Sequence, residues 1–174
     1  MRINVGKPNA DIIETDFGGC LAVGNNADAD LALQGVGGYD LVVYAAKEVR
    51  PLPQVFADRF GRRRPIAVHY IPLLDTLFLT PSEQFSLQLT IPRIASAFKK
   101  GKRVLVTCNM GINRCAFVAG LVLHAVYPMS GAEALQRVRV RRARGTPLQN
   151  GYYAKMLAEK PPRRHLERFR ESFL

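Results

Sequence analysis

This sequence has few cysteines and no long apolar segment. Its three cysteines among 174 residues are an odd number without a repeating spacing, which argues against a disulfide framework and fits a reducing compartment. The longest apolar run, residues 116–127, is too short to span a bilayer, and residues 1–8 contain no apolar signal core. We therefore expect a cytoplasmic protein with no membrane span.

Histidine is also scarce, and repeats are missing. His69, His124 and His165 show no metal-ligand spacing, so we interpret them as structural or surface residues and expect no metal and no organic cofactor. A chain of this length, without internal repeats or a clear linker, suits one domain with one core. We predict a single domain over residues 1–174, with its core at about 10–160 and a basic helix at 162–174.

Acidic residues are outnumbered, 14 against 25 basic ones, which gives a net charge of +11. The excess is uneven, since residues 1–50 carry a net −3, residues 51–100 a net +4 and residues 101–174 a net +10. A half this basic favours anionic ligands by long-range attraction. A solvated arginine-rich surface is the commoner explanation of such charge runs, and it stays open here.

Residues 104–120 have the pattern of a buried strand, a tight polar loop and an apolar helix. Cys108 opens the loop and Arg114 closes it. Backbone N–H groups of such a loop, together with the unpaired first N–H groups of the helix and its dipole, form a nest for a dianion. Gly111 allows the turn without a Cβ clash, and we expect the helix to begin near Gly111 or Ile112.

The two ends of this loop have chemistry that suits a phosphate ester. Arg114 can donate two parallel N–H bonds to two phosphate oxygens, which lysine cannot do. The positive field of the loop N–H groups and the helix dipole lowers the pKa of Cys108, which we expect to be a thiolate and a nucleophile. An ordinary strand-turn-helix with a buried cysteine is the alternative. The candidate phosphate-binding residues are Asn109, Met110, Gly111, Ile112, Asn113 and Arg114.

This loop resembles that of the cysteine-dependent dual-specificity protein phosphatases, in the protein tyrosine phosphatase superfamily, which has the pattern His-Cys-x5-Arg-Ser/Thr. Cys108 and Arg114 match, and Gly111 and Asn113 are familiar at their positions. The resemblance covers about residues 10–160 and is specific at the loop. It implies an α/β fold with a central, mostly parallel sheet flanked by helices, and phosphomonoester hydrolysis through a phosphocysteine.

The resemblance also implies a general acid. In the family, the strand at the position of residues 66–72 leads to a mobile loop that carries an aspartate, and Asp75 matches it in order and in flanking residues. This carboxyl group protonates the leaving oxygen and later takes a proton from the attacking water. The simpler alternative is a loop aspartate that caps a turn.

Two residues depart from the family pattern. Thr107 stands where the family has a histidine that supports the loop, which predicts some loss of rate. Cys115 stands where the family has a hydroxyl that steadies the thiolate as it leaves, and a thiol is only a weak donor. We therefore predict slower hydrolysis of the intermediate. Cys115 should also lie near Cys108, and the pair is a candidate for a reversible disulfide switch.

The remaining elements follow from apolar runs and helix caps. Thr80, Pro81 and Glu83 predict a helix start, and Pro92 should kink or divide that helix. Ser130 and Glu133 form a second capping box, and Asn150 is predicted to cap the helix at residues 152–159. Predicted strands cover a hairpin at residues 11–24 and residues 40–46, 66–72 and 103–107; residues 50–65 are predicted as a loop; predicted helices cover residues 27–34, 81–100, 131–141 and 152–159.

Three functions remain open from the sequence. The first is dephosphorylation of phosphotyrosine and phosphoserine or phosphothreonine in proteins. The second keeps the chemistry but changes the substrate to an RNA 5′ end or a phosphoinositide; no basic motif interleaved with aromatics is present, so nucleic acid is not favoured. The third is a phosphate-binding module without turnover, in which Thr107 and Cys115 mark lost chemistry.

Overall fold

The computed structural model describes residues 10–49, 55–57, 63–142 and 147–162. The basic helix expected at residues 162–174 therefore lies almost wholly outside the described residues. Within the described ranges, no helix is both long enough and apolar enough to cross a membrane.

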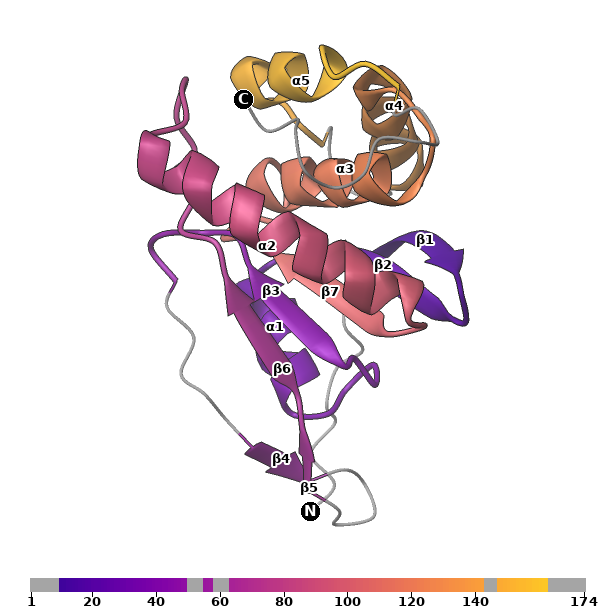
Figure 1. Cartoon of the computed structure of the whole chain (residues 1–174). Helices are drawn as coiled ribbons and strands as arrows, with labels where there is room; N and C mark the ends of the chain where they lie inside the picture. The colour runs from indigo at the N-terminus through magenta and orange to yellow at the C-terminus, as the bar shows by residue number, and fades with distance from the viewer. Residues whose placement is uncertain (1–9, 50–54, 58–62, 143–146, 163–174) are drawn as a thin grey trace.

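A five-stranded sheet forms the centre of the molecule, with strand order β1-β2-β7-β3-β6 (Figure 1). The hairpin of β1 (Asp11–Asp16) and β2 (Gly19–Gly24) is antiparallel, whereas β2, β7 (Arg103–Thr107), β3 (Leu41–Tyr44) and β6 (Ala67–Tyr70) are parallel. The predicted fold class, α/β with a mostly parallel sheet flanked by helices, is confirmed. Parallel strands place their carboxyl ends at one edge, where ligand sites of such sheets lie.

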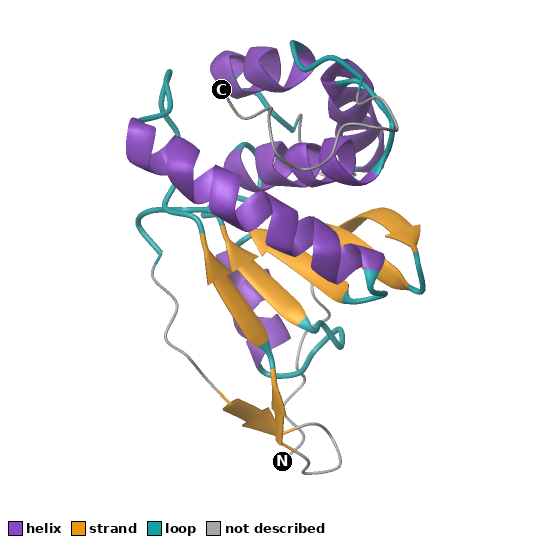
Figure 2. Ribbon diagram, in the orientation of Figure 1, coloured by secondary structure: helices purple, strands orange, loops and turns teal. Residues whose placement is uncertain are grey.

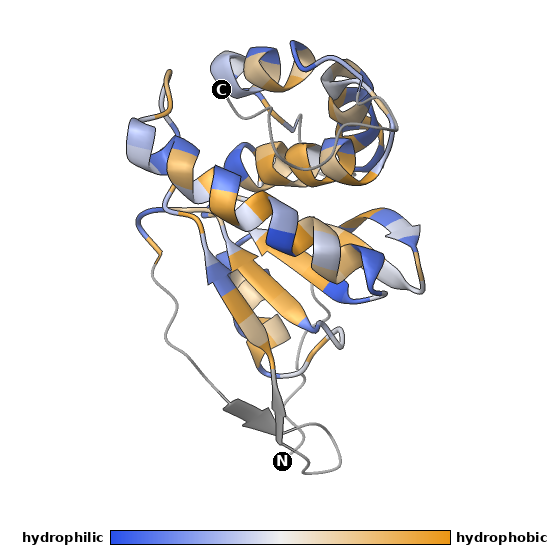
Figure 3. Cartoon of the chain, viewed as in Figure 1, coloured by the Kyte–Doolittle hydropathy of each residue, from blue (hydrophilic) through white to orange (hydrophobic). Residues whose placement is uncertain are grey.

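Helices cover both faces of this sheet (Figure 2). On one face lie α2 (Pro81–Lys99) and α3 (Arg114–Val126), with α4 (Gly131–Arg141) and α5 (Gly151–Ala158) packed over α3, and on the other lies α1 (Asn26–Leu33). Alternation along β7 divides the core accordingly, because Val104 and Val106 pack with α2 and α3 while Leu105 packs with α1. Figure 3 shows α3 apolar along most of its length, as a helix buried between layers must be.

The predicted helix caps are present. Thr80 with Glu83 and Ser130 with Glu133 form capping boxes, and Asn150 caps α5. Pro92 does not divide α2, which runs unbroken through it. The predicted loop at residues 50–65 contains a short antiparallel pair, β4 (Val55–Ala57) and β5 (Arg63–Pro65), because backbone pairing does not depend on the proline- and arginine-rich composition that suggested a loop.

Candidate active site

The loop between β7 and α3 is the centre of the candidate site. Cys108 follows the last residue of β7, and α3 begins at Arg114, later than the predicted start at Gly111 or Ile112. The prediction was wrong because Gly111 has φ +70°, a left-handed conformation that no helix can include. A Cβ at Gly111 would lie 2.9 Å from Arg142 Nη2 and 3.0 Å from the backbone of Gly24, so the loop packs tightly on both.

The two cysteines of the loop are in direct contact. Cys108 is 2% exposed and Cys115 is fully buried, and their Sγ atoms lie 3.4 Å apart, close together as the sequence predicts. The pKa of Cys108 is lowered to about 6 by the Cys115 thiol as donor, the Cys115 backbone N–H, the Arg114 charge and the Gly111 N–H. Burial of Cys108 opposes this shift. Burial and the neighbouring Cys108 raise the pKa of Cys115. At neutral pH, Cys108 is therefore the thiolate and Cys115 keeps its proton.

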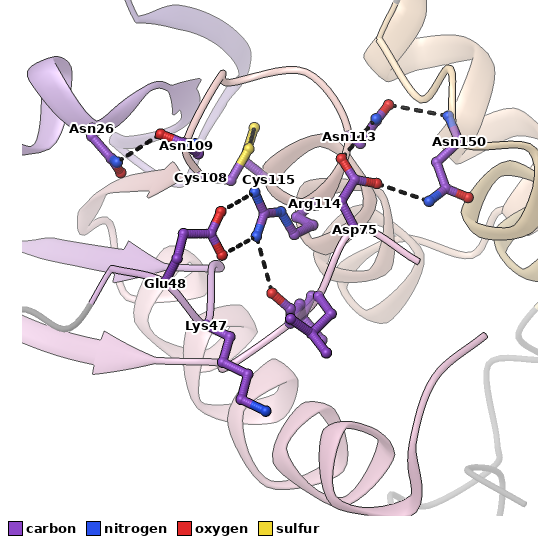
Figure 4. A network of polar contacts seen from close by, with 12 residues as sticks. Asn26, Lys47, Glu48, Asp75, Cys108, Asn109, Asn113, Arg114, Cys115 and Asn150 are labelled. Carbon is purple, nitrogen blue, oxygen red and sulfur yellow. Dashed lines mark hydrogen bonds and ion pairs between the residues drawn. The ribbon is translucent and has the colours of Figure 1, made fainter. Parts of the chain in front are cut away.

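Arg114 is held by an acidic residue from the loop that follows β3, the strand next to β7. Its Nη1 and Nη2 donate to the two carboxylate oxygens of Glu48 at 2.6 and 2.5 Å, and Nη1 also donates to the Leu73 carbonyl at 3.1 Å (Figure 4). The hydrogen bond from Arg114 lowers the pKa of Glu48. The Nε of Arg114 is buried and has no hydrogen-bond partner in the structure. Three of the five guanidinium N–H groups make these bonds, so the guanidinium is fixed in direction while the Nε N–H and one Nη2 N–H remain for a ligand.

Asp75 lies close to the far end of the same loop. Its Oδ2 accepts from Asn113 Nδ2 at 2.9 Å and its Oδ1 accepts from Asn150 Nδ2 at 2.8 Å. The backbone N–H of Asn150 donates to Asn113 Oδ1 at 3.1 Å, which closes the group seen in Figure 4. The structure therefore brings the three predicted catalytic residues, Cys108, Arg114 and Asp75, to one loop.

The other predicted loop residues form its rim. Asn109 is exposed and its Oδ1 accepts from Asn26 Nδ2 at 3.2 Å. Met110 is 70% exposed, and the carbonyl of Ile112 accepts from the Leu148 N–H at 3.2 Å. Thr107, in place of the family's histidine, is buried and donates from Oγ1 to the Val43 carbonyl at 3.4 Å. It therefore ties the start of the loop to β3.

Glu48 and Asn150 were not among the predicted site residues. Asn150 was recognised only as a helix cap. Glu48 carried a usable signal, because it follows β3 and the carboxyl ends of neighbouring parallel strands meet at one edge. For Asn150 the sequence carries no signal beyond the helix cap, since its contact with Asp75 joins residues 75 positions apart.

The arginines of α4 are largely engaged within the molecule. Arg137 pairs with Glu14 at 2.7 Å, and Arg139 donates to the carbonyls of Pro147 and Leu148. Buried Arg142 pairs with Asp11 at 2.9 Å. Arg137, Arg139 and Arg142, which belong to the basic second half of the chain, therefore hold α4 to its neighbours.

Comparison with known proteins rests on structure alone, since no protein-family model and no curated protein matches the sequence. Human DUSP28 is 21% identical over 88% of this chain and 95% of its own, with a TM-score of 0.61. OH1 from the Orf virus, titled a tyrosine phosphatase with triple substrate specificity, is 20% identical over 87% and 88%, with a TM-score of 0.59. The chain has the dual-specificity phosphatase fold.

A third structure with this dual-specificity phosphatase fold is the human tyrosine phosphatase-like serine/threonine/tyrosine-interacting protein. It is 18% identical over 85% of this chain and 92% of its own, with a TM-score of 0.63. The three structures confirm the resemblance noted at the Cys108 loop as a likeness of fold. At these identities they leave the activity to the chemistry of the site.

Proposed function

We propose that this chain is a phosphomonoester hydrolase that works through a phosphocysteine and dephosphorylates phosphotyrosine and phosphoserine or phosphothreonine in proteins. One observation carries the proposal: a thiol with a pKa of about 6, an oriented guanidinium and a carboxylate meet at one loop. The start of α3 contributes further, because Asn113 makes no side-chain cap bond there and the Cys115 N–H in the first turn donates a hydrogen bond to the Cys108 sulfur.

The proposed reaction has two steps. Phosphate oxygens bind the N–H groups of residues 109–114 and the Nε of Arg114, and Cys108 Sγ attacks phosphorus while the P–O ester bond breaks. Asp75 gives its proton to the departing oxygen. Water then attacks phosphorus and gives a proton to Asp75, and the P–S bond breaks to return inorganic phosphate and the thiolate. The Cys115 S–H steadies that thiolate.

The rim favours a protein substrate over a polyanion. Met110 on the phosphate loop, and Leu77 and Phe78 just after Asp75, are 70%, 80% and 62% exposed. Apolar groups at this position suit a phenyl ring or a peptide side chain. The intramolecular pairing of Arg137 and Arg142 weakens the case for RNA or a phosphoinositide headgroup.

A phosphate-binding module without turnover is the alternative from a different class. The fold is shared with a protein titled phosphatase-like and interacting, and Thr107 and Cys115 depart from the family pattern. The lowered pKa of Cys108 argues for an enzyme, because a site that only binds phosphate needs no thiolate.

The test is a substrate panel with the full chain. We expect wild type to hydrolyse p-nitrophenyl phosphate and Cys108→Ser to lose at least about a thousandfold in kcat/KM. Cys20→Ala, at a buried cysteine on the other face of the sheet, is the control and should keep the activity. Wild-type binding of phosphate without hydrolysis would favour the module. Faster turnover of 5′-phosphorylated RNA or of a phosphoinositide than of phosphopeptides, across several salt concentrations, would overturn the protein substrate.

A further inference from the structure

The first turn of α5 is bonded to the loop that carries Asp75. Asn150 Nδ2 donates to Asp75 Oδ1 at 2.8 Å and to the Thr76 carbonyl at 2.9 Å. Tyr153 donates from its hydroxyl to the Leu74 carbonyl, and the Leu79 N–H donates to the Tyr152 hydroxyl at 3.3 Å. Residues 74–79 are thus attached to α5 along most of their length.

The amide of Asn150 has its orientation fixed by the helix it caps. Its Oδ1 accepts from the backbone N–H groups of Tyr152 and Tyr153 at 3.1 and 3.3 Å. A backbone N–H can only donate, so the oxygen must face the helix and the NH2 group must face Asp75. The cap therefore decides which end of the amide meets the carboxylate.

Asn113 holds the other oxygen of the same carboxylate. The backbone N–H of Asn150 donates to the Oδ1 of Asn113, so the Nδ2 of Asn113 must face Asp75 Oδ2. Asn113 occupies the cap position of α3 but makes no capping bond there. The side chain of Asn113 reaches Asp75 instead of capping α3.

We propose that Asn150 and Asn113 are positioning residues that hold the Asp75 carboxyl in place beside the phosphate loop before a substrate binds. This inference rests on the proposed function and deepens it, because it names what orients the acid. Each carboxylate oxygen has one amide donor, which restricts rotation of the group.

Asn150→Ser separates the two roles of the Asn150 amide. Serine is as good a cap as asparagine, but its short side chain cannot reach Asp75. We expect kcat/KM to fall about tenfold on phenyl phosphate, whose leaving group needs a proton, and to stay within about twofold on p-nitrophenyl phosphate, whose leaving group departs without one. Gln149→Ser, at the exposed neighbour of Asn150, should change the activity on neither substrate.

A double-mutant cycle tests whether Asn150 acts through Asp75. In an Asp75→Asn background, adding Asn150→Ser should cause no further loss on phenyl phosphate. Equal losses on both substrates, no loss in the single variant, or an additive loss in the double variant would each overturn the proposal.

A readout without catalysis keeps this inference separate from the proposed function. Amide hydrogen exchange of residues 74–79 should quicken in Asn150→Ser while exchange in α5 stays as in wild type, because the cap remains. This result would stand even if wild type hydrolysed no phosphate ester, which would refute the proposed function alone. Unchanged exchange of residues 74–79 would refute the positioning role whatever the activity.

Discussion

The contact between Cys108 and Cys115 gives this site its own chemistry. The Cys115 thiol is the largest of the influences that lower the pKa of Cys108, and burial keeps the proton on Cys115. A thiol donor therefore lies beside Cys108 at the position where the family resemblance implies a hydroxyl. The slower second step and the disulfide between the two cysteines stay predictions.

The reactivity of Cys108 should follow its pKa. A thiolate reacts with iodoacetamide and a thiol does not, so the alkylation rate should rise with pH through a midpoint of about 6. Cys115→Ala removes the thiol donor, and its midpoint should move upward toward that of an ordinary cysteine, about 8.5. Rates are measured by mass spectrometry of the peptide with Cys108. A wild-type midpoint that stays near the ordinary value would contradict the thiolate assignment, and Cys20→Ala should leave the curve unchanged.

Among the helices, α4 and α5 approach each other closely at Gly131. The Gly131 N–H, at the start of α4, donates to the Lys160 carbonyl just beyond α5 at 2.9 Å. A Cβ added at Gly131 would overlap the carbonyl oxygen of Leu157, which is backbone and cannot swing away. The close approach of the two helices therefore requires glycine at this position.

We expect Gly131→Ala to destabilise the protein by about 2 kcal/mol, because the overlap outweighs the gain of up to about 1 kcal/mol in helix propensity. Gly151→Ala is the matched variant, since a Cβ at that helix start would meet nothing within 4 Å. It should leave the stability unchanged or raise it by about 0.5 kcal/mol. Urea unfolding gives both free energies. Equal stability of the two variants would show that the helices can separate at little cost.

Over the whole molecule, the acidic first strand neutralises part of the basic second half. Asp11 and Glu14 on β1 pair with Arg142 and Arg137 on α4, and Asp16 accepts from the Tyr127 hydroxyl at 2.9 Å. These contacts join residues more than 100 positions apart and hold the hairpin against α4. Arg142 also packs against Gly111, so its pairing with Asp11 supports the loop between β7 and α3.

Burial should decide how much each pair contributes to stability. Arg142 is 5% exposed in its side chain and Asp11 15%, so Asp11→Asn leaves a buried charge without its counter-charge and should cost about 2 kcal/mol. Arg137 is 42% exposed, so Glu14→Gln should cost about 0.5 kcal/mol or less. Urea unfolding of both variants at low and high salt measures the difference. Equal costs would mean that the Arg142 guanidinium finds other partners.

The sequence by itself determined the local features of this protein. The β-branched run, Cys108, Gly111 and Arg114 specify strand, turn and anion nest within a few residues, and Thr80, Ser130 and Asn150 specify helix starts. Such features need only neighbouring backbone groups, which is why most of the predicted helices and strands were found. The fold class was implied by the family resemblance at the Cys108 loop. The start of α3 was misplaced, because the tight packing on Gly24 and Arg142 keeps Gly111 left-handed and out of the helix.

Only the tertiary structure decided what surrounds those features. Strand order sets Glu48 beside Arg114, and the packing of α5 over α3 sets Asn150 beside Asp75. Both contacts join distant segments, and no local pattern records which segments will meet. The amide of Asn150 shows the division most clearly. Its oxygen accepts from the helix that directly follows in the sequence, whereas its nitrogen donates to Asp75, 75 residues away.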